Sequence, residues 1–385
     1  MKKLEISKED LKYNLNQINN LIEEECKKHD KPKPEIIAVA KSNGMGLDLV
    51  KYSKFLSENG VKKIAVSNVD EAVILGKENI DAEIIMLSPT SIEEEVQALI
   101  ESGVTITIGS EQDLEIAKKV CDEKSKVIKA CLKIDTGFSR YGFIYKDIDN
   151  IINTLKNEKN LEFVYCFSHL SDARSEVSSY KQFNRFLSVK KKIEESGIKT
   201  LKYHICNSTG FLKYNEMWMD CVRLGSCIQG RVLVKKELFK VIGSFKSNVA
   251  AIKYIDSGET VSYSNIFKAP KRMKIAVIPV GNMDGFNYGK LRDDYTFKNN
   301  VIAVLMEFRK IFRDNTLKVK INGKKRIVIG RLGMYHCIVD VTDDPNVEIN
   351  QEVQIDIAPL NVNSNIRREY IWWNRNFKRW IFLKD

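Results

Sequence analysis

The sequence predicts an α/β protein in which a closed (β/α)8 barrel of the TIM type is followed by a C-terminal all-β domain. Up to about residue 230, short apolar runs alternate with amphipathic, helix-like stretches, and we count eight such runs. Alternating strands and helices imply right-handed crossovers and a parallel sheet, and eight units are what a closed barrel requires. From about residue 240 the runs are β-like, separated by Gly, Asn and Asp turns and without long helical periodicity.

The predicted barrel strands are short and apolar, and amphipathic segments such as GLDLVKYSKFLSENG separate them. They are IIAVAK (36–41), KIAVS (63–67), EIIML (83–87), TITIG (105–109), VIKACLKI (127–134), FVYCFSHL (163–170), KYHICN (202–207) and CVRLG (221–225). A doubly wound open sheet is the alternative, but no G-x-G-x-x-G follows an early strand. We predict a barrel domain over residues 1–238 and a β domain over residues 239–385, with NVIAVLMEF (300–308) among its β-like segments.

Composition narrows the class of protein. With 385 residues and 43% hydrophobic content, the chain suits two domains with substantial cores. It has no apolar run of about 18 residues, so we expect no membrane span and no membrane partner. The N-terminus lacks the apolar stretch of a signal peptide. The eight cysteines are scattered without a C-x-x-C pair, so we expect reduced thiols, a cytoplasmic protein and no metal site.

The formal charge of +11 raises the question of a nucleic-acid partner. The basic residues are spread among 51 acidic ones, as in KKKIEESGIK, where they fit solvated helix faces. The densest basic segment is the C-terminal NSNIRREYIWWNRNFKRWIFLKD, which could stack on nucleic acid but which we predict to be a structural terminal strand. We therefore expect no nucleic-acid partner. The charge suits anionic small molecules such as phosphates and carboxylates.

Polar residues gather at the ends of the predicted barrel strands, where the chemistry of such barrels takes place. Taken singly, a strand-end lysine or a strand histidine is usually structural, so the prediction depends on their convergence at one mouth. They are Lys41 after the first strand, Lys133, Asp135 and Arg140 on and after the fifth, and His169, His204 and Arg223 on the next three. The loops after the seventh and eighth strands, which often bind phosphate, contain Ser208 and Gly225-Ser226.

Several of these segments resemble the motifs of the alanine racemase family. AVAKSNGMG is similar to that family's lysine motif, KIDTGFSRYGF to its arginine motif, and HICNSTG and CVRLGSCIQG to its histidine/serine and second arginine motifs. VSYSN followed by IPVGNMDGF resembles the tyrosine region of the second domain, and LEISKEDLKYNLNQI resembles the opening strand and helix. The motifs occur in family order over about residues 1–370. The resemblance implies a pyridoxal-phosphate-dependent amino acid racemase, which is an isomerase.

The resemblance also implies a role for each matching residue. Lys41 would bind pyridoxal phosphate covalently, and Lys41 and Tyr263 would be the two catalytic bases, with Tyr263 supplied by the other subunit of a homodimer with shared active sites. The cofactor contacts would be Lys41, Arg140, His169, His204, Ser208, Arg223, Gly225 and Ser226. Arg223 would contact the pyridine nitrogen, with His204 orienting it, and Arg140 would also meet the substrate carboxylate. In some family members the lysine that corresponds to Lys133 is carbamylated and braces this arginine.

Departures from the family pattern concentrate at positions that face substrate or phosphate. Met45 stands where the family carries a phosphate-binding tyrosine, and Asn282 replaces a tyrosine at the entrance. Gly333-Met334-Tyr335 replaces Cys-Met-Asp, and Arg368 stands where a tyrosine normally reaches phosphate and substrate. We expect Asn282, Met334 and Arg368 to contact substrate. We also expect the smaller residues at positions 282 and 333 to relax the pocket, so that alanine is not the best substrate.

The sequence leaves three other functions open. A barrel-type pyridoxal-phosphate-dependent amino acid decarboxylase shares the lysine-bearing barrel, but its Gly-rich phosphate stretch and its catalytic cysteine motif are not evident here. A pyridoxal-phosphate-binding protein without efficient racemase activity is the second, although single-domain relatives of that kind lack the β domain that carries Tyr263. A nucleic-acid binder would depend on the basic tail and the net charge alone.

Overall fold

The structure is a computed structural model that describes residues 1–289, 296–311, 316–374 and 379–381. The chain divides into two compact units, one of Lys8–Ile242 and one of Met1–Ser7 together with Gly243–Asp385. This division differs from the predicted ranges at the N-terminus, because residues 1–7 belong to the second unit. There β1 (Lys3–Ser7) pairs antiparallel with β11 (Ser244–Asn248) and parallel with β20 (Arg367–Asn374).

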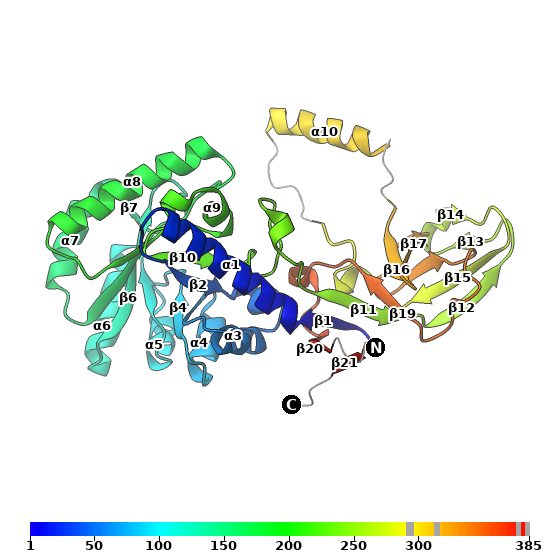
Figure 1. Cartoon of the computed structure of the whole chain (residues 1–385), viewed down its shortest axis with the longest axis horizontal. Coiled ribbons are helices and arrows are strands. Elements are labelled where there is room, and N and C mark those ends of the chain that lie inside the picture. The colour runs from blue at the N-terminus through cyan, green and yellow to red at the C-terminus, as the bar shows by residue number, and fades with distance from the viewer. Residues whose placement is uncertain (290–295, 312–315, 375–378, 382–385) are drawn as a thin grey trace. The chain divides into compact units, whose positions relative to one another are not determined.

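The unit Lys8–Ile242 contains the predicted parallel barrel (Figure 1). Its strands run in two parallel groups, β10-β2-β3-β4 and β5-β6-β8-β9. A bridge between Ile85 and Thr105 connects β4 to β5, and the Arg223 N–H donates to the Cys206 carbonyl beside β9 and β10, so the ring closes. The strands are β2 Glu35–Val39, β3 Lys63–Val66, β4 Glu83–Met86, β5 Ile106–Ile108, β6 Ile128–Asp135, β8 Leu161–Phe167, β9 Lys202–His204 and β10 Cys221–Leu224, with the short β7 Phe143–Ile144 beside β6.

Helices follow the strands where amphipathic segments begin at a polar cap. The side chains of Asn68, Ser110 and Ser175 each accept a backbone N–H at the start of α4, α6 and α8, which satisfies donors that a helix leaves free in its first turn. The helices are α1 Lys8–Lys28, α3 Leu49–Glu58, α4 Val69–Lys77, α5 Glu93–Glu101, α6 Glu111–Lys124, α7 Ile148–Asn157, α8 Glu176–Glu195 and α9 Ser208–Lys213; α2 (Lys41–Met45) is a left-handed turn.

Side chains of six barrel strands fill the interior. The buried cluster consists of Ile37, Ala65, Ile85, Cys131, Tyr165, Phe167 and Cys221. Because these side chains pack against one another, the interior is a core and not a channel. Space for a ligand is therefore left at the ends of the strands, as is usual for this fold.

The second unit is built on a ten-stranded sheet in the order β12-β15-β18-β17-β16-β19-β11-β1-β20-β21. Val261, Ala269, Met273, Ile275 and Ile329 form a buried cluster in it. The further strands are β12 Ala251–Ile255, β13 Thr260–Val261, β14 Phe267–Lys268, β15 Met273–Ile278, β16 Lys318–Ile321, β17 Lys324–Ile329, β18 Cys337–Asp340, β19 Glu352–Ile355 and β21 Arg379–Ile381. The prediction of a structural strand in the basic tail is confirmed, since β20 pairs with both β1 and β21.

One predicted strand of this unit is wrong. The segment 300–308 lies in a helix, α10 (Phe297–Ile311), and not in the sheet. Val301, Ile302 and Val304 suggest a strand by composition, but Phe297, Val301, Val304, Leu305 and Phe308 recur at intervals of three and four residues. That spacing places them on one face of a helix, so the helical period prevails over β propensity. Within the described ranges, every helix is too short or too polar to traverse a bilayer.

Candidate active site

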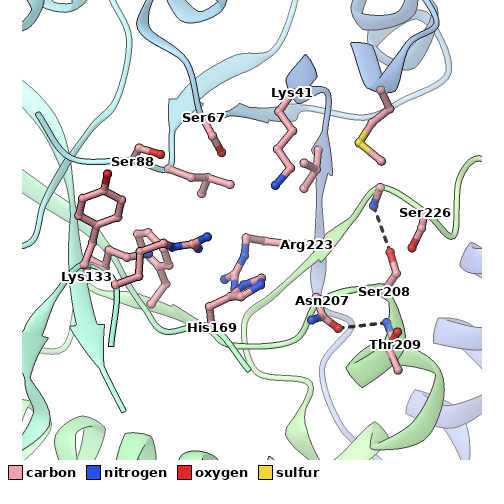
Figure 2. Close-up of a pocket in the computed structure, with 17 residues that line it drawn as sticks. Lys41, Ser67, Ser88, Lys133, His169, Asn207, Ser208, Thr209, Arg223 and Ser226 are labelled. Atoms are coloured by element: carbon pink, nitrogen blue, oxygen red, sulfur yellow. Dashed lines mark hydrogen bonds between the residues drawn. The ribbon is translucent and has the colours of Figure 1, made fainter. Parts of the chain in front are cut away.

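A cavity of about 350 Å³ opens at the carboxyl ends of the barrel strands (Figure 2). Its size is within the range of small-molecule sites. It is lined by Val39, Lys41, Met45, Ser67, Leu87, Ser88, Lys133, Arg140, Tyr141, Phe167, His169, Asn207, Ser208, Thr209, Arg223, Gly225 and Ser226. Every cofactor-contact residue expected in the barrel therefore lines the cavity, except His204, which lies behind Arg223.

Lys41 follows β2 and extends into the cavity (Figure 2). Partial burial and the nearby charges of Arg140 and Arg223 lower the pKa of its ammonium group, while the Glu71 carboxylate opposes that shift. A lowered pKa increases the fraction of neutral amine, which is the form that acts as a nucleophile or a base. The surroundings of Lys41 therefore favour the reactive neutral amine, which distinguishes it from an ordinary charged residue at the end of a strand.

The chain turns sharply after Lys41. The φ values of the next four residues, Ser42, Asn43, Gly44 and Met45, are all positive and lie between 56° and 65°. This is the left-handed region, which residues other than glycine rarely adopt. The Glu71 carboxylate, from the first turn of α4, accepts the backbone N–H groups of Ser42 at 3.1 Å and Asn43 at 2.6 Å. The turn that presents Lys41 is therefore tied to a neighbouring helix.

Arg223, on β10, is buried, and protein groups from neighbouring strands accept several of its N–H groups. It donates to His204 Nδ1, to the carbonyl of Ser168 at 2.6 Å and to His169 Nδ1 at 3.1 Å. Burial lowers the pKa of Arg223 to about 10, which keeps it charged at neutral pH. Burial and the Arg223 charge hold the pKa values of both histidines well below the ordinary value, so the rings are neutral. Neutral imidazoles can accept from the guanidinium, and they fix its position.

Lys133 and Arg140 come from β6 and from the loop that follows it. The Lys133 ammonium lies 4.3 Å from the centroid of the Phe167 ring, and burial together with Arg223 and Arg140 lowers its pKa to about 7. The Asp135 carboxylate accepts the N–H groups of residues 137, 138 and 139 at 2.7, 2.9 and 3.1 Å. Asp135 thereby shapes the loop that carries Arg140. The sequence placed Asp135 near the site but did not indicate this role.

The loops after β9 and β10 meet at Ser208. The Ser208 hydroxyl oxygen accepts the N–H groups of Gly225 at 3.1 Å and Cys227 at 3.2 Å, so the hydroxyl proton is what it has to donate to a ligand. A Cβ at Gly225 would lie 3.3 Å from Val39 Cβ and 3.5 Å from Met45 Cε. The position is therefore tight, and a small residue keeps this wall of the cavity open.

The charges around the cavity have one sign. Lys41, Lys133, Arg140 and Arg223 line it, and none of the described lining residues is an aspartate or glutamate. Four cations in one cavity repel one another unless an anion is bound. The arrangement therefore suits ligands with several negative charges, such as a phosphate ester bound together with a substrate that carries a carboxylate.

Tyr263 lies on the second unit, in the 3-10 turn η4 (Tyr263–Asn265), and its side chain is 60% exposed. The residues around it, Ser262, Ser264 and Asn265, have φ values of 67°, 60° and 50°. Ser262 Oγ donates to the Arg331 carbonyl at 2.6 Å, which helps to hold this backbone. Strained backbone of this kind concentrates at functional sites, so the observation agrees with a functional tyrosine.

Asn282 and Met334 are exposed and lie on adjoining loops of the same unit. The Asn282 N–H donates to the Gly333 carbonyl at 3.1 Å, and the Met283 N–H donates to the Met334 carbonyl at 3.0 Å. A Cβ at Gly333 would lie 2.8 Å from the His336 imidazole, whose centroid is 6.3 Å from that of Tyr263. The small residue at 333 therefore accommodates the His336 ring, and the space is not left empty.

Arg368 is buried within the second unit and does not project into solvent. Its guanidinium donates to the carbonyls of Val362 at 2.9 Å, Asn363 at 2.7 Å and Ser364 at 2.9 Å. These contacts tie β20 to the loop that precedes it. The expectation that Arg368 contacts substrate stays a prediction, and the carbonyl contacts are a role for this arginine that the sequence alone did not indicate.

Sequence reasoning missed several residues of the site. Ser67, Ser88, Tyr141 and Thr209 line the cavity without having been predicted. Ser67 follows β3 directly and Ser88 follows β4 after one intervening residue, so position after a barrel strand was an available signal. Glu71 had a misleading signal, because Asn68-x-x-Glu71 has the form of a helix capping box.

Comparison with known proteins agrees with this geometry. The family described as alanine racemase, N-terminal domain, matches residues 6–231, and alanine racemase, C-terminal domain, matches residues 242–364. Alanine racemase of Methanococcus maripaludis is 30% identical over 89% of this chain and 87% of its own length. Alanine racemase of Clostridium tetani is 31% identical over 91% of this chain and 84% of its own length.

Solved structures show the same fold. Alanine racemase of Clostridium difficile 630 superimposes with a TM-score of 0.83 at 21% identity, covering 99% of this chain and 97% of the other. Alanine racemase of Bartonella henselae, with covalently bound pyridoxal phosphate, gives a TM-score of 0.75 at 22% identity over 96% and 99% of the two chains. With both domain families matched in order and curated relatives aligned over most of their length, the chain belongs to the alanine racemase family.

Proposed function

We propose that this chain is a pyridoxal-phosphate-dependent amino acid racemase that interconverts the L- and D-forms of a small amino acid such as alanine or serine. The observation that carries the proposal is the environment of Lys41. Its ammonium group, with a lowered pKa, extends into a cavity that three other cations line. A lysine in such surroundings can bind an anionic aldehyde covalently and can afterwards act as a base.

The residues of the cavity fit pyridoxal phosphate. Ser208, Gly225 and Ser226 supply a tight, small-residue wall with a hydroxyl donor, which suits the phosphate. Arg223, held by His204 and His169, would face the ring nitrogen, and His169 would pack against the ring. Pyridoxal phosphate supplies an electron sink that acidifies the α-proton of an amino acid joined to it.

Racemisation requires a proton acceptor and a proton donor on opposite faces of the α-carbon. Lys41 serves one face, and its lowered pKa favours the neutral amine that accepts a proton. Tyr263 serves the other face, and Arg140 binds the substrate carboxylate. Arg223 stays cationic at neutral pH, so it does not donate its proton to the ring nitrogen. This limits the electron sink and favours proton exchange over other reactions of the same group.

We infer that Tyr263 reaches the active site of a second subunit in a homodimer. Two features support this. The phenol is 60% exposed on its own unit, and the backbone around it is held in the left-handed region. An exposed tyrosine whose neighbours have strained backbone contributes little to the packing of its own unit, so we attribute its role to contacts with another subunit.

The substrate is proposed to be small. Gly333, which in the sequence favours a substrate other than alanine, and Arg368, which is expected to contact substrate, are both engaged within their own unit. His336 fills the space beside Gly333, and Arg368 binds the carbonyls of its own loop. Asn282, which is exposed, remains as a residue that could admit a larger side chain. We therefore propose alanine or serine, and the preference between them is an outcome of the experiment below.

Other features support the remaining parts of the proposal. All eight cysteines are buried and free of disulfides, which favours a reducing cytoplasm. Part of the basic tail pairs as β20 in the sheet, which weakens the case for a nucleic-acid arm. The matched C-terminal domain, which carries Tyr263, argues against a cofactor-binding protein without racemase activity. The named relatives are racemases and not decarboxylases.

The test is a panel of L- and D-amino acids supplied to the cofactor-loaded protein in deuterated water. Deuterium at the α-carbon together with loss of optical purity is expected for alanine or serine. Release of carbon dioxide would identify a decarboxylase instead. No exchange with any amino acid, from protein that carries the cofactor on Lys41, would contradict racemase function. Lys41→Ala is the control for reaction by free cofactor.

A further inference from the structure

Glu71 occupies the first turn of α4, but its carboxylate is directed to a different segment. It accepts the backbone N–H of Ser42 at 3.1 Å through one oxygen and that of Asn43 at 2.6 Å through the other. These two residues follow Lys41 directly. One carboxylate therefore bridges two successive N–H groups of the turn that presents the lysine.

The turn needs such a partner. Consecutive left-handed residues other than glycine are energetically unfavourable, because Cβ approaches the following carbonyl oxygen. Ser42, Asn43 and Met45 are such residues. Successive N–H groups in left-handed conformation also point into one concavity, which binds anions well. Glu71 supplies that anion from within the protein.

Other contacts hold the remainder of the turn. Asn43 Oδ1 accepts the N–H of Leu49 at 2.9 Å, and Gln229 Nε2 donates to the Met45 carbonyl at 2.9 Å. These two contacts engage the Asn43 side chain and the Met45 carbonyl, and not the N–H groups that follow Lys41. Glu71 is the contact that reaches the two N–H groups next to the lysine.

A role in capping its own helix does not explain the Glu71 side chain. In α4 the Asn68 side chain accepts the Glu71 N–H at 3.2 Å, which is one half of a capping box. The reciprocal half would require the Glu71 carboxylate to accept the Asn68 N–H. Its two oxygens are instead engaged by Ser42 and Asn43.

We propose that Glu71 is a positioning residue for Lys41: by bridging the N–H groups of Ser42 and Asn43, it fixes the left-handed turn in the geometry from which Lys41 binds the cofactor. The proposal deepens the proposed function and, for its cofactor arm, rests on it. Attachment condenses the Lys41 amine with the aldehyde of pyridoxal phosphate and releases water. A turn that samples other conformations presents the amine in the right place for a smaller fraction of the time.

The first measurement needs no cofactor. Hydrogen exchange of the protein stripped of pyridoxal phosphate is followed at the Ser42 and Asn43 amides, for wild type and Glu71→Gln. Exchange at both amides is expected to rise about tenfold or more, because hydrogen bonds to a charged acceptor are lost. Amides of α8, which has none of these contacts with the turn, are the internal reference and should not change. Unchanged exchange at Ser42 and Asn43 would contradict the tether.

The second measurement follows attachment of pyridoxal phosphate to Lys41, by borohydride trapping and peptide mapping over time. Glu71→Gln and Glu71→Ala should lower the attachment rate by about tenfold or more. The matched control is Asp70→Asn, which removes the same charge one residue away on the same turn and should change the rate by less than about threefold. An equal loss in Asp70→Asn would assign the effect to charge at the helix start.

The third measurement refills the concavity. In Glu71→Gly, added formate should restore attachment, because a free carboxylate can bridge the same two N–H groups. Neutral formamide and equal chloride should not restore it, and wild type in the same solutions corrects for competition at the phosphate contacts. No recovery with formate, or the same recovery with chloride, would contradict the proposal. Thermal unfolding of each variant shows whether the barrel itself remains folded.

The outcomes separate this proposal from the proposed function. If wild type carries the cofactor on a lysine other than Lys41, the proposed function fails, but the exchange measurement still tests the tether. If wild type carries it on Lys41 and Glu71→Gln attaches it at the wild-type rate, only the positioning role fails.

Discussion

The cavity of the barrel and the surface around Tyr263 differ in burial and in how their side chains are held. The cavity is lined by cations, and one of them, Arg223, is already held by two histidines and a carbonyl. Tyr263 stands on strained backbone with its phenol 60% exposed, and the neighbouring Met334 is 57% exposed. One region is enclosed by its own unit, whereas the other presents its side chains outward.

This difference indicates a division of labour. A site that stabilises several like charges requires burial and fixed acceptors, which a closed barrel supplies at its strand ends. A second base need only be presented in a fixed conformation. The four predictions below test the comparison, from the largest expected effect to the smallest.

Lys41→Ala should remove both cofactor attachment and racemisation. Without the amine there is neither a covalent anchor nor the first base, so activity should fall by more than roughly a thousandfold. Borohydride reduction and peptide mapping should find the label on the Lys41 peptide of wild type and nowhere else. Stoichiometric label on another lysine would mean that this other lysine, and not Lys41, binds the cofactor.

Tyr263→Phe should lower racemisation by about a hundredfold to ten-thousandfold, because one proton transfer loses its partner. Cofactor attachment should remain at the wild-type level, since Lys41, which forms the covalent link, and the proposed phosphate contacts are unchanged. Mixing Lys41→Ala with Tyr263→Phe protein should restore part of the activity, because hybrid dimers contain one site with both bases. No recovery despite demonstrated subunit exchange would argue that both bases act within one chain.

Lys133→Met should stabilise the protein below about pH 7 and lose that advantage as the pH rises. Burial beside Arg223 lowers the folded-state pKa of Lys133 to about 7, whereas the unfolded chain keeps the ordinary value of 10.5. The unfolded state therefore binds more protons between these values, so wild-type stability increases with pH across that window. A pKa difference of one between the two states corresponds to about 1.4 kcal/mol, so the substitution should gain on the order of a few kcal/mol.

Urea unfolding at several pH values measures this effect. The matched control is Lys129→Met, which removes an exposed lysine from the same strand, β6. Its effect on stability should be small and nearly independent of pH. A flat difference between wild type and Lys133→Met across the window would mean that the buried amine is not destabilised by its neighbours.

Gly333→Ala should cost about 1–3 kcal/mol of stability, because the new Cβ would lie 2.8 Å from the His336 ring. In a His336→Ala background the same substitution should cost little, so a double-mutant cycle should give a clear coupling energy. Gly289→Ala is the control, since a Cβ there meets nothing within 4 Å. Independent effects at 333 and 336 would mean that the glycine is not there to accommodate the imidazole.

The sequence by itself determined the framework of the protein. Alternating strand and helix patterns identified the barrel, because the periods of apolar residues are local properties of a chain. Strand ends identified Lys41, Arg140, His169 and Arg223 as one group, since parallel strands of a closed barrel bring their carboxyl ends to one mouth. The order of the motifs was sufficient to identify the family.

Only the tertiary structure decided which partners these residues have. β1 belongs to the sheet of the second unit, where it pairs with β11 and β20. Both partners lie more than 230 residues further along the chain, so local sequence patterns could not reveal the pairing. Glu71 reads locally as a helix cap but contacts Ser42 and Asn43, and Arg368 binds carbonyls of its own loop. A residue's type determines which contacts it can make. The fold decides which atoms from distant or adjoining segments are present to make them.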